Sequence, residues 1–87
     1  MNGRTPTSAD VAAAIMRDLR ELPRTTAPAV RAVRRPYSRT LADESPDVVL
    51  AIVRCLLTEN SWSARVVAFE LLDGHDGARR RLRASTV

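Results

Sequence analysis

Arginine is the residue type in this sequence that is best suited to hold another molecule. The chain has 87 residues and a net charge of +4, and all fourteen of its basic residues are arginine. A guanidinium group presents several N–H donors in a planar fork that matches the oxygens of a phosphate. One cluster surrounds Pro36 and forms the predicted nucleic-acid-binding site, which consists of Arg31, Arg34, Arg35 and Arg39.

Two alternatives remain open for these arginines. The cluster around Pro36 could be a solvated basic face that has no ligand. A second run lies near the C-terminus, where a disordered basic tail is the alternative to a phosphate contact; it contains Arg79, Arg80, Arg81 and Arg83. The only aromatic residue within the first cluster is Tyr37, so stacking on the bases of a single strand is not predicted.

The acidic residues and the single histidine do not predict an active site. Most of the ten carboxylates fall at expected helix caps, first turns or outward faces, and no two converge by spacing into a catalytic pair. His75 lies between Asp73 and Asp76 in the segment DGHDG, where these residues suit a turn as well as a site. The sequence has no glycine-rich phosphate loop and no zinc-ligand spacing. We therefore predict no catalytic residue, no metal site and no cofactor.

The stretch 45–73 is expected to form the core, as two apolar helices joined by a short turn. Ser45 suits a helix N-cap and Pro46 suits the first helical position. Apolar residues of the first helix then recur at the spacing of one buried face, and these are Val49, Ile52, Val53, Leu56 and Leu57. Asn60 or Ser61 is expected to cap the second helix.

The second helix of this pair has apolar residues on two sides. One stripe contains Ala64, Val67, Ala68, Leu71 and Leu72. A second stripe contains Trp62, Val66 and Phe69. A helix that is apolar on two sides is expected to have neighbours on both. This pattern predicts an all-α fold of the HEAT-like or armadillo type, a helical repeat array of about five or six helices.

The remaining segments are expected to be helices and connectors within one domain. We predict a disordered N-terminus over 1–7, a single helical-repeat domain over 8–83 and a frayed C-terminus over 84–87. The first helix is expected to end near Leu22. Pro36 is expected to interrupt any helix through it and to begin a new short one that ends at Asp43. The last helix is expected to run from Gly77 to about Leu82, with a cap at Asp76.

Hydropathy predicts a soluble, cytoplasmic protein with no membrane partner. No apolar run approaches the roughly 20 residues of a transmembrane helix, and the N-terminus lacks the apolar segment of a signal peptide.

Two segments together resemble a known family. Residues 33–42 have the sequence VRRPYSRTLA, which is similar to a V-R-x-P-x-x-R-x-x-A segment near the start of the bacterial DNA alkylation repair enzymes. The segment RVVAFEL at 65–71 looks like that family's later Arg-x-x-Ala-x-x-Leu helix. The resemblance covers about residues 9–83. It implies a HEAT-like scaffold of the kind found in the AlkD-like alkylpurine DNA glycosylases.

The same resemblance does not extend to the catalytic residues of the family. Members of that family are more than twice as long as this chain, and their essential Asp belongs to later repeats. In addition, Ser63 stands where the family has an acidic residue before the helix arginine, which corresponds to Arg65 here. The expected function is thus that of a truncated or non-catalytic DNA-alkylation-repair-like protein that binds double-stranded DNA along its backbone.

Two other functions remain open. The alternative from a different class is a protein-interaction module without nucleic-acid function, which binds a second copy of the chain or another polypeptide through an exposed end of the array. Salt distinguishes this module from a DNA-binding protein, because phosphate binding weakens steeply with salt and apolar docking does not. A third possibility is a glycosylase that a partner chain completes.

Overall fold

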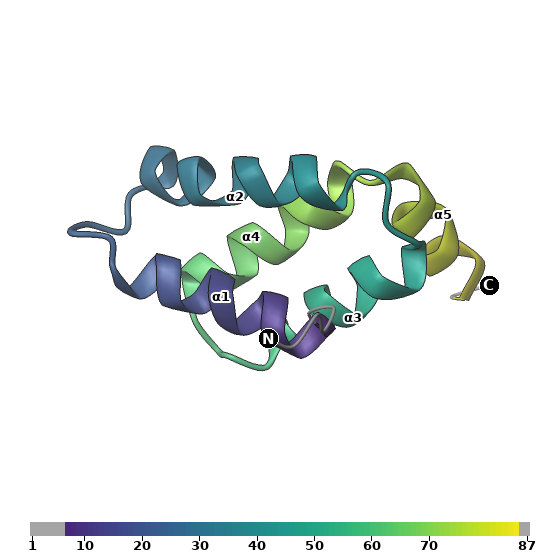
Figure 1. Cartoon of the computed structure of the whole chain (residues 1–87), viewed down its shortest axis with the longest axis horizontal. Helices are drawn as coiled ribbons and strands as arrows, with labels where there is room; N and C mark the ends of the chain where they lie inside the picture. Colours follow the sequence, from purple (N-terminus) through teal and green to yellow (C-terminus); the bar gives the residue numbers. More distant parts are fainter. Residues whose placement is uncertain (1–6, 86–87) are drawn as a thin grey trace, which may run out of the picture.

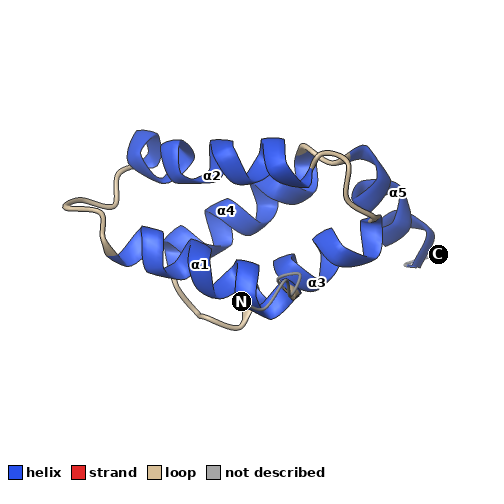
Figure 2. Cartoon of the chain, viewed as in Figure 1, coloured by secondary structure: helices blue, strands red, loops and turns tan. Residues whose placement is uncertain are grey.

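A computed structural model describes residues 7–85, and these form five α-helices and no strand (Figures 1 and 2). The helices are α1 (Ser8–Arg20), α2 (Ala27–Leu41), α3 (Pro46–Leu57), α4 (Trp62–Asp73) and α5 (Asp76–Ser85). The predicted all-α class is confirmed. No described helix is long and apolar enough to cross a bilayer.

Each helix begins at a residue whose side chain satisfies a free amide of the first turn. Thr7, Thr26, Ser45 and Ser61 supply a hydroxyl oxygen that accepts a hydrogen bond from the backbone N–H three residues later. Thr7 and Asp10 complete a reciprocal capping box at α1. These caps explain why the helices start where they do.

The cap of α5 is a histidine, whereas the sequence had indicated Asp76. The Nδ1 atom of His75 accepts a hydrogen bond from the N–H of Ala78 over 3.0 Å. Its Nε2 atom lies 3.0 Å from the carbonyl oxygen of Glu44, which can only accept, so the ring proton is on Nε2. His75 thereby joins α5 to the loop that precedes α3.

Helices α3 and α4 together form the centre of the packing. α4 contacts each of the other four helices, and α3 contacts α1, α4 and α5 (Figure 1). The core is aliphatic, and its largest fully buried side chains are Ile15, Val30, Val49, Ile52, Leu56 and Val67. Ala64, Ala68 and Ala78 are also fully buried, which allows the helices to approach closely. This arrangement is compatible with a helical repeat.

The prediction that Pro36 interrupts the helix is wrong, because α2 is continuous through it. Proline cannot donate the hydrogen bond that residue 36 would give to the carbonyl of Ala32. Both residues are exposed, so water can satisfy that carbonyl instead. The short helix predicted to begin at Pro36 is therefore the C-terminal part of one helix of fifteen residues.

The predicted boundaries differ in smaller ways. Residues 1–6 and 86–87 lie outside the described part of the chain, and so do the predictions made for them. Thr7 is ordered as a cap, although 1–7 had been predicted as disordered. The last helix extends to Ser85, into the segment predicted to fray. The first helix ends at Arg20, two residues earlier than expected.

The second apolar stripe of α4 does not have the neighbour that was predicted for it. Trp62 is 54% exposed and Phe69 is 57% exposed, and Val66 between them is only partly buried. The first stripe is buried as expected, through Ala64, Val67, Ala68 and Leu71. Within the described chain, α4 is thus packed on one side and open on the other.

Candidate nucleic-acid interface

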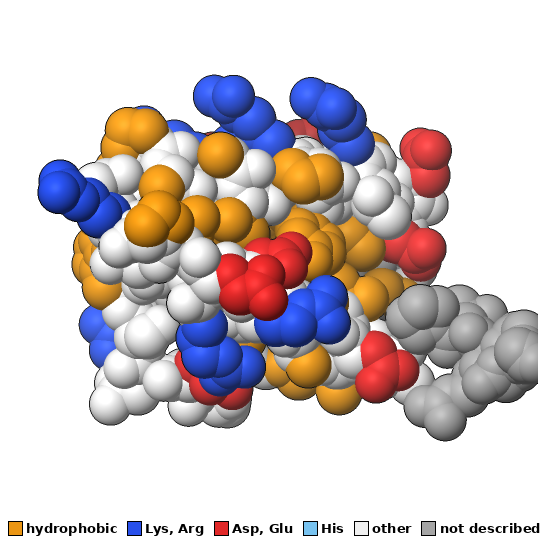
Figure 3. All heavy atoms as spheres, turned by 60° about the vertical axis from the view of Figure 1, so that its left-hand side comes forward, with side chains coloured by type: hydrophobic (Ala, Val, Ile, Leu, Met, Phe, Trp, Pro, Cys, Tyr) orange, Lys and Arg blue, Asp and Glu red, His pale blue; other side chains and the backbone are white. Residues whose placement is uncertain are grey.

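The structure brings the four predicted arginines together on one side of α2. At 100° per residue, Arg31, Arg34, Arg35 and Arg39 fall within an arc of about 140° of the helix circumference. The α2 sequence, APAVRAVRRPYSRTL, contains no acidic residue. In the space-filling view, basic side chains stand out along the upper edge of the molecule, which α2 forms in Figure 1 (Figure 3).

Half of this cluster is held by a single carboxylate from another helix. The Nε–H groups of Arg31 and Arg34 each donate to one oxygen of Glu70 in α4, over 3.1 Å in both cases. The Arg34 side chain is only 23% exposed, and its NH1 group also donates to the hydroxyl of Ser38 over 3.1 Å. Glu70 therefore fixes two guanidinium groups and ties α2 to α4.

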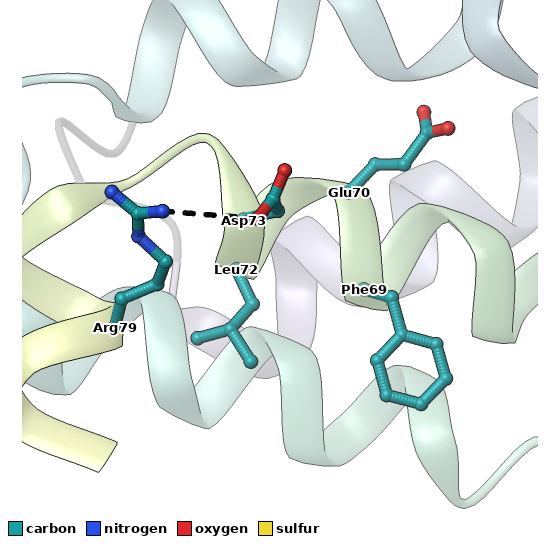
Figure 4. Close-up of a pocket in the computed structure, with 5 residues that line it drawn as sticks. All are labelled: Phe69, Glu70, Leu72, Asp73 and Arg79. Carbon is teal, nitrogen blue, oxygen red and sulfur yellow. Dashed lines mark ion pairs between the residues drawn. The ribbon is translucent and has the colours of Figure 1, made fainter. Parts of the chain in front are cut away.

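Glu70 is the residue of this region that the sequence did not predict. Its signal was present, because it is one of the few polar residues on a mostly apolar helix. Its partners lie 36 and 39 positions away in the sequence, so their spacing gave no indication of the contact. In Figure 4, the Glu70 carboxylate and the Phe69 ring point to opposite sides of α4.

The other half of the cluster has no such partner. Arg35 and Arg39 are exposed, and neither forms an ion pair with any residue in the described range 7–85. Their guanidinium groups are therefore available to an external anion. These two residues, beside the pair that Glu70 holds, give α2 a strongly cationic face.

A tyrosine fixes α2 from the opposite side. The hydroxyl of Tyr37 donates a hydrogen bond to Asp18 of α1 over 2.6 Å. Partial burial, followed in size by the hydrogen bond to the Asp18 carboxylate, raises the pKa of Tyr37 to about 12. The phenol therefore stays neutral at physiological pH. Because it faces α1, this aromatic ring does not stack beside the arginines.

The second arginine run differs, because carboxylates from three segments lie against it. In α5, Arg79 pairs with Asp73 and with Asp76. Arg81 lies 3.2 Å from Asp47 of α3. The run is helical and so is not the disordered tail that was the alternative for it.

The described residues contain no group of three or more His, Cys, Asp or Glu side chains that could hold a metal ion. Arg65 donates a hydrogen bond to the side-chain oxygen of Asn60 over 3.1 Å. The single cysteine, Cys55, packs at the edge of the core. None of these residues adds catalytic machinery to the arginine face.

No family model, curated protein or solved structure matches this chain. The resemblance to the DNA alkylation repair enzymes, and with it the expected history in DNA repair, stays a prediction. A functional argument for this protein therefore depends on its own residues.

Proposed function

We propose that this protein binds the phosphate backbone of double-stranded DNA through α2. The observation that supports this most is the balance of charge on that helix. Four guanidinium groups share one arc, and a single carboxylate, Glu70, lies against two of them. Phosphate contact by Arg, together with release of bound counterions, supplies most of the affinity of sequence-independent DNA binding.

The spacing of the arginines suits a line of phosphates. Residues 31–39 rise by about 12 Å along the helix axis, while a duplex carries one negative charge per about 1.7 Å of its length. Several arginines can thus meet phosphates at once. The bonds from Arg31 and Arg34 to Glu70 fix the positions of both guanidinium groups, while the carboxylate offsets part of their charge.

The same geometry argues for binding without sequence preference. Direct readout of bases needs side chains that enter a groove and meet base edges in pairs. The other exposed residues between Arg31 and Arg39 are Ala32 and Pro36, and neither has a hydrogen-bonding side chain. The exposed aromatic residues, Trp62 and Phe69, belong to α4. The proposed role is therefore backbone contact, without recognition of a base and without catalysis.

The experiment that tests this proposal is a fluorescence-anisotropy titration of a labelled duplex over a salt series. We expect binding at low salt that weakens steeply as salt is added, with equal affinity for alkylated and undamaged duplexes. Replacing Arg35 and Arg39 together by Ala should lower the slope of log K against log salt by about 2, because each lost phosphate contact removes about 0.9.

A matched control keeps the net charge of that variant. Arg20 and Arg54 are exposed residues of α1 and α3, outside the α2 arc. Their joint replacement by Ala should leave the slope nearly unchanged. No binding at low salt, or an equal loss in both double variants, would refute α2 as the contact surface.

A protein-interaction module is the second candidate, and the open stripe of α4 favours it. Large aromatic side chains that are more than half exposed are typical of the centre of protein interfaces. Binding of this kind depends on apolar area and changes little with salt.

A further inference from the structure

The outward face of α4 carries both a projecting apolar side chain and an apolar hollow. Trp62 projects at the first turn of the helix, and Val66 and Phe69 continue the same face at intervals of four and three residues. The hollow lies at the other end, where α4 meets α5 (Figure 4). Helix α4 therefore presents both a side chain that can insert into a partner and a hollow that can receive one.

The hollow has a volume of about 430 Å³. Phe69 and Leu72 give it apolar walls, and Glu70, Asp73 and Arg79 complete the lining. Asp73 and Arg79 form an ion pair of 3.8 Å across one side of it, as Figure 4 shows. The apolar walls beside the Arg79 guanidinium suit a flat aromatic ring, because Arg packs favourably against the face of an indole.

We propose that α4 packs antiparallel against α4 of a second copy of this chain, so that Trp62 of each copy occupies the hollow of the other. The occupant is a second copy because the same helix presents both the ring and the hollow. Trp62 and Leu72 are ten residues apart, which is about 15 Å along the helix. A two-fold axis between them exchanges the two positions, as a symmetric dimer interface requires.

The charges at the two ends of this face are also self-complementary. Arg65 follows Trp62 by one turn, and Asp73 lies at the hollow with its side chain 85% exposed. In the antiparallel arrangement, Arg65 of one copy approaches Asp73 of the other on each side of the axis. Antiparallel helices also bring opposite ends of their dipoles together.

The small number of contributing residues predicts a weak dimer. The interface is centred on four partly exposed aromatic rings, two from each copy, whereas a standard stable interface involves about 20–30 residues of each partner. We expect a dissociation constant in the micromolar range. This inference rests on the second candidate function. Because it uses α4, whereas the proposed DNA contact uses α2, either can fail without the other.

The first test is sedimentation velocity of the purified chain without nucleic acid, from about 1 μM to about 1 mM. We expect conversion from monomer to dimer across this range. Trp62 is the only tryptophan, so its fluorescence emission should move to shorter wavelength over the same concentrations as the indole leaves water. A chain that stays monomeric with unchanged emission would overturn the proposal.

Variants then identify the surface. Trp62→Ala should weaken the dimer at least tenfold, as expected for a central aromatic residue of an interface. Leu57→Ala is the matched control, because Leu57 is also apolar and 40% exposed but belongs to α3. It should change the dissociation constant by less than about twofold. Equal dimerisation of the Trp62 variant and the native chain would exclude α4 as the interface.

A charge exchange tests the orientation of the two helices. Arg65→Asp and Asp73→Arg should each weaken the dimer, because each brings like charges together across the interface. The two changes in one chain should restore part of the affinity, since each contact between the copies is again between opposite charges, whereas the ion pair of Asp73 with Arg79 stays lost. A double variant that is weaker than both single variants would rule out the antiparallel pairing. Circular dichroism of each variant confirms that its fold is intact.

Discussion

The two arginine-rich helices have the same number of arginines but very different surroundings. In α2, four arginines face one carboxylate, Glu70, and none of the helix's own residues is acidic. In α5, four arginines lie among three carboxylates, contributed by Asp47, Asp73 and Asp76. With the same number of arginines, α2 therefore has a large excess of positive charge, whereas the charges around α5 are nearly balanced.

This difference shows that the placement of acids, more than the number of bases, decides where an anion can bind. A surface ion pair contributes little to stability, typically under about 1 kcal/mol. It nevertheless lowers the local potential that attracts phosphate. By this criterion α2 is the cationic face of the molecule, and α5 is held to α3 and α4 by its ion pairs.

The largest expected effect comes from giving α2 an acid of its own. Ala32 is exposed and lies three residues before Arg35, so Ala32→Glu would place a carboxylate within reach of that guanidinium. We expect duplex affinity to fall about tenfold at moderate salt, with a shallower salt slope. Ala32→Gln has nearly the same size and no charge, and should bind like the native chain. Equal affinity of both variants would show that α2 does not meet DNA.

The next effect sharpens the role of Glu70. Glu70→Gln would break the ion pairs to Arg31 and Arg34, so we expect a loss of about 1–2 kcal/mol in the free energy of unfolding. Duplex affinity should rise at the same time, because α2 gains net positive charge. Asp47→Asn removes one exposed partner of α5 and should change stability by less than about 0.5 kcal/mol. Urea denaturation of both variants measures the contrast, which vanishes if Glu70 is an ordinary surface acid.

A smaller effect concerns the start of α5. His75→Ala would remove the acceptor for the N–H of Ala78 and the bond to Glu44, at a cost of about 1 kcal/mol. His75→Asn restores an acceptor suited to a helix cap and should recover most of that loss. If both variants unfold at the same urea concentration as the native chain, the ring does not stabilise α5.

The smallest effect concerns the contact of α2 with α1. Tyr37→Phe should cost about 0.5 kcal/mol at neutral pH, the low end for a partly exposed hydrogen bond. The folded-state pKa, about 12, lies above the ordinary value of 10.0, so the stability from this group is complete below pH 10. It should be lost as the pH rises through 12.

Ultraviolet absorbance can follow this titration, because Tyr37 is the only tyrosine. The stability of the Phe variant should depend less on pH in the alkaline range. An ionisation midpoint near 10 in the folded chain would contradict the partly buried, hydrogen-bonded state of the phenol.

Much of the fold could be predicted from local patterns. The helices α1, α3, α4 and α5 follow from apolar spacing and from polar caps such as Ser45, because both signals lie within a few residues of each other. The continuity of α2 could not be predicted in this way. Whether Pro36 ends a helix depends on whether water reaches the carbonyl it leaves unbonded, which is a property of the folded surface.

The sequence predicted which arginines belong to the candidate site, but it did not predict which of them form ion pairs. Clustering in sequence identified Arg31, Arg34, Arg35 and Arg39, and the structure places them on one helix face. The division into two arginines that Glu70 holds and two without an ion pair among residues 7–85 depends on Glu70, which only tertiary packing brings near. The prediction that a neighbouring helix covers the second apolar stripe of α4 was wrong for a related reason. Apolar residues such as Phe69 indicate that a surface favours burial, but hydropathy does not say which molecule covers it.

Pro36 has a mechanical consequence for the helix that carries the arginines. It removes one rung from the hydrogen-bond ladder of α2, and the hydroxyl of Thr40 donates to the carbonyl of Pro36 over 2.9 Å, a local bond that favours bending. The half before Pro36 is held by Glu70, and the half after it is held by the bond from Tyr37 to Asp18 and by buried Leu41. Amide hydrogen exchange should therefore be fastest in the turn around Pro36, and the arginine face should behave as two anchored segments that bend relative to each other at that residue.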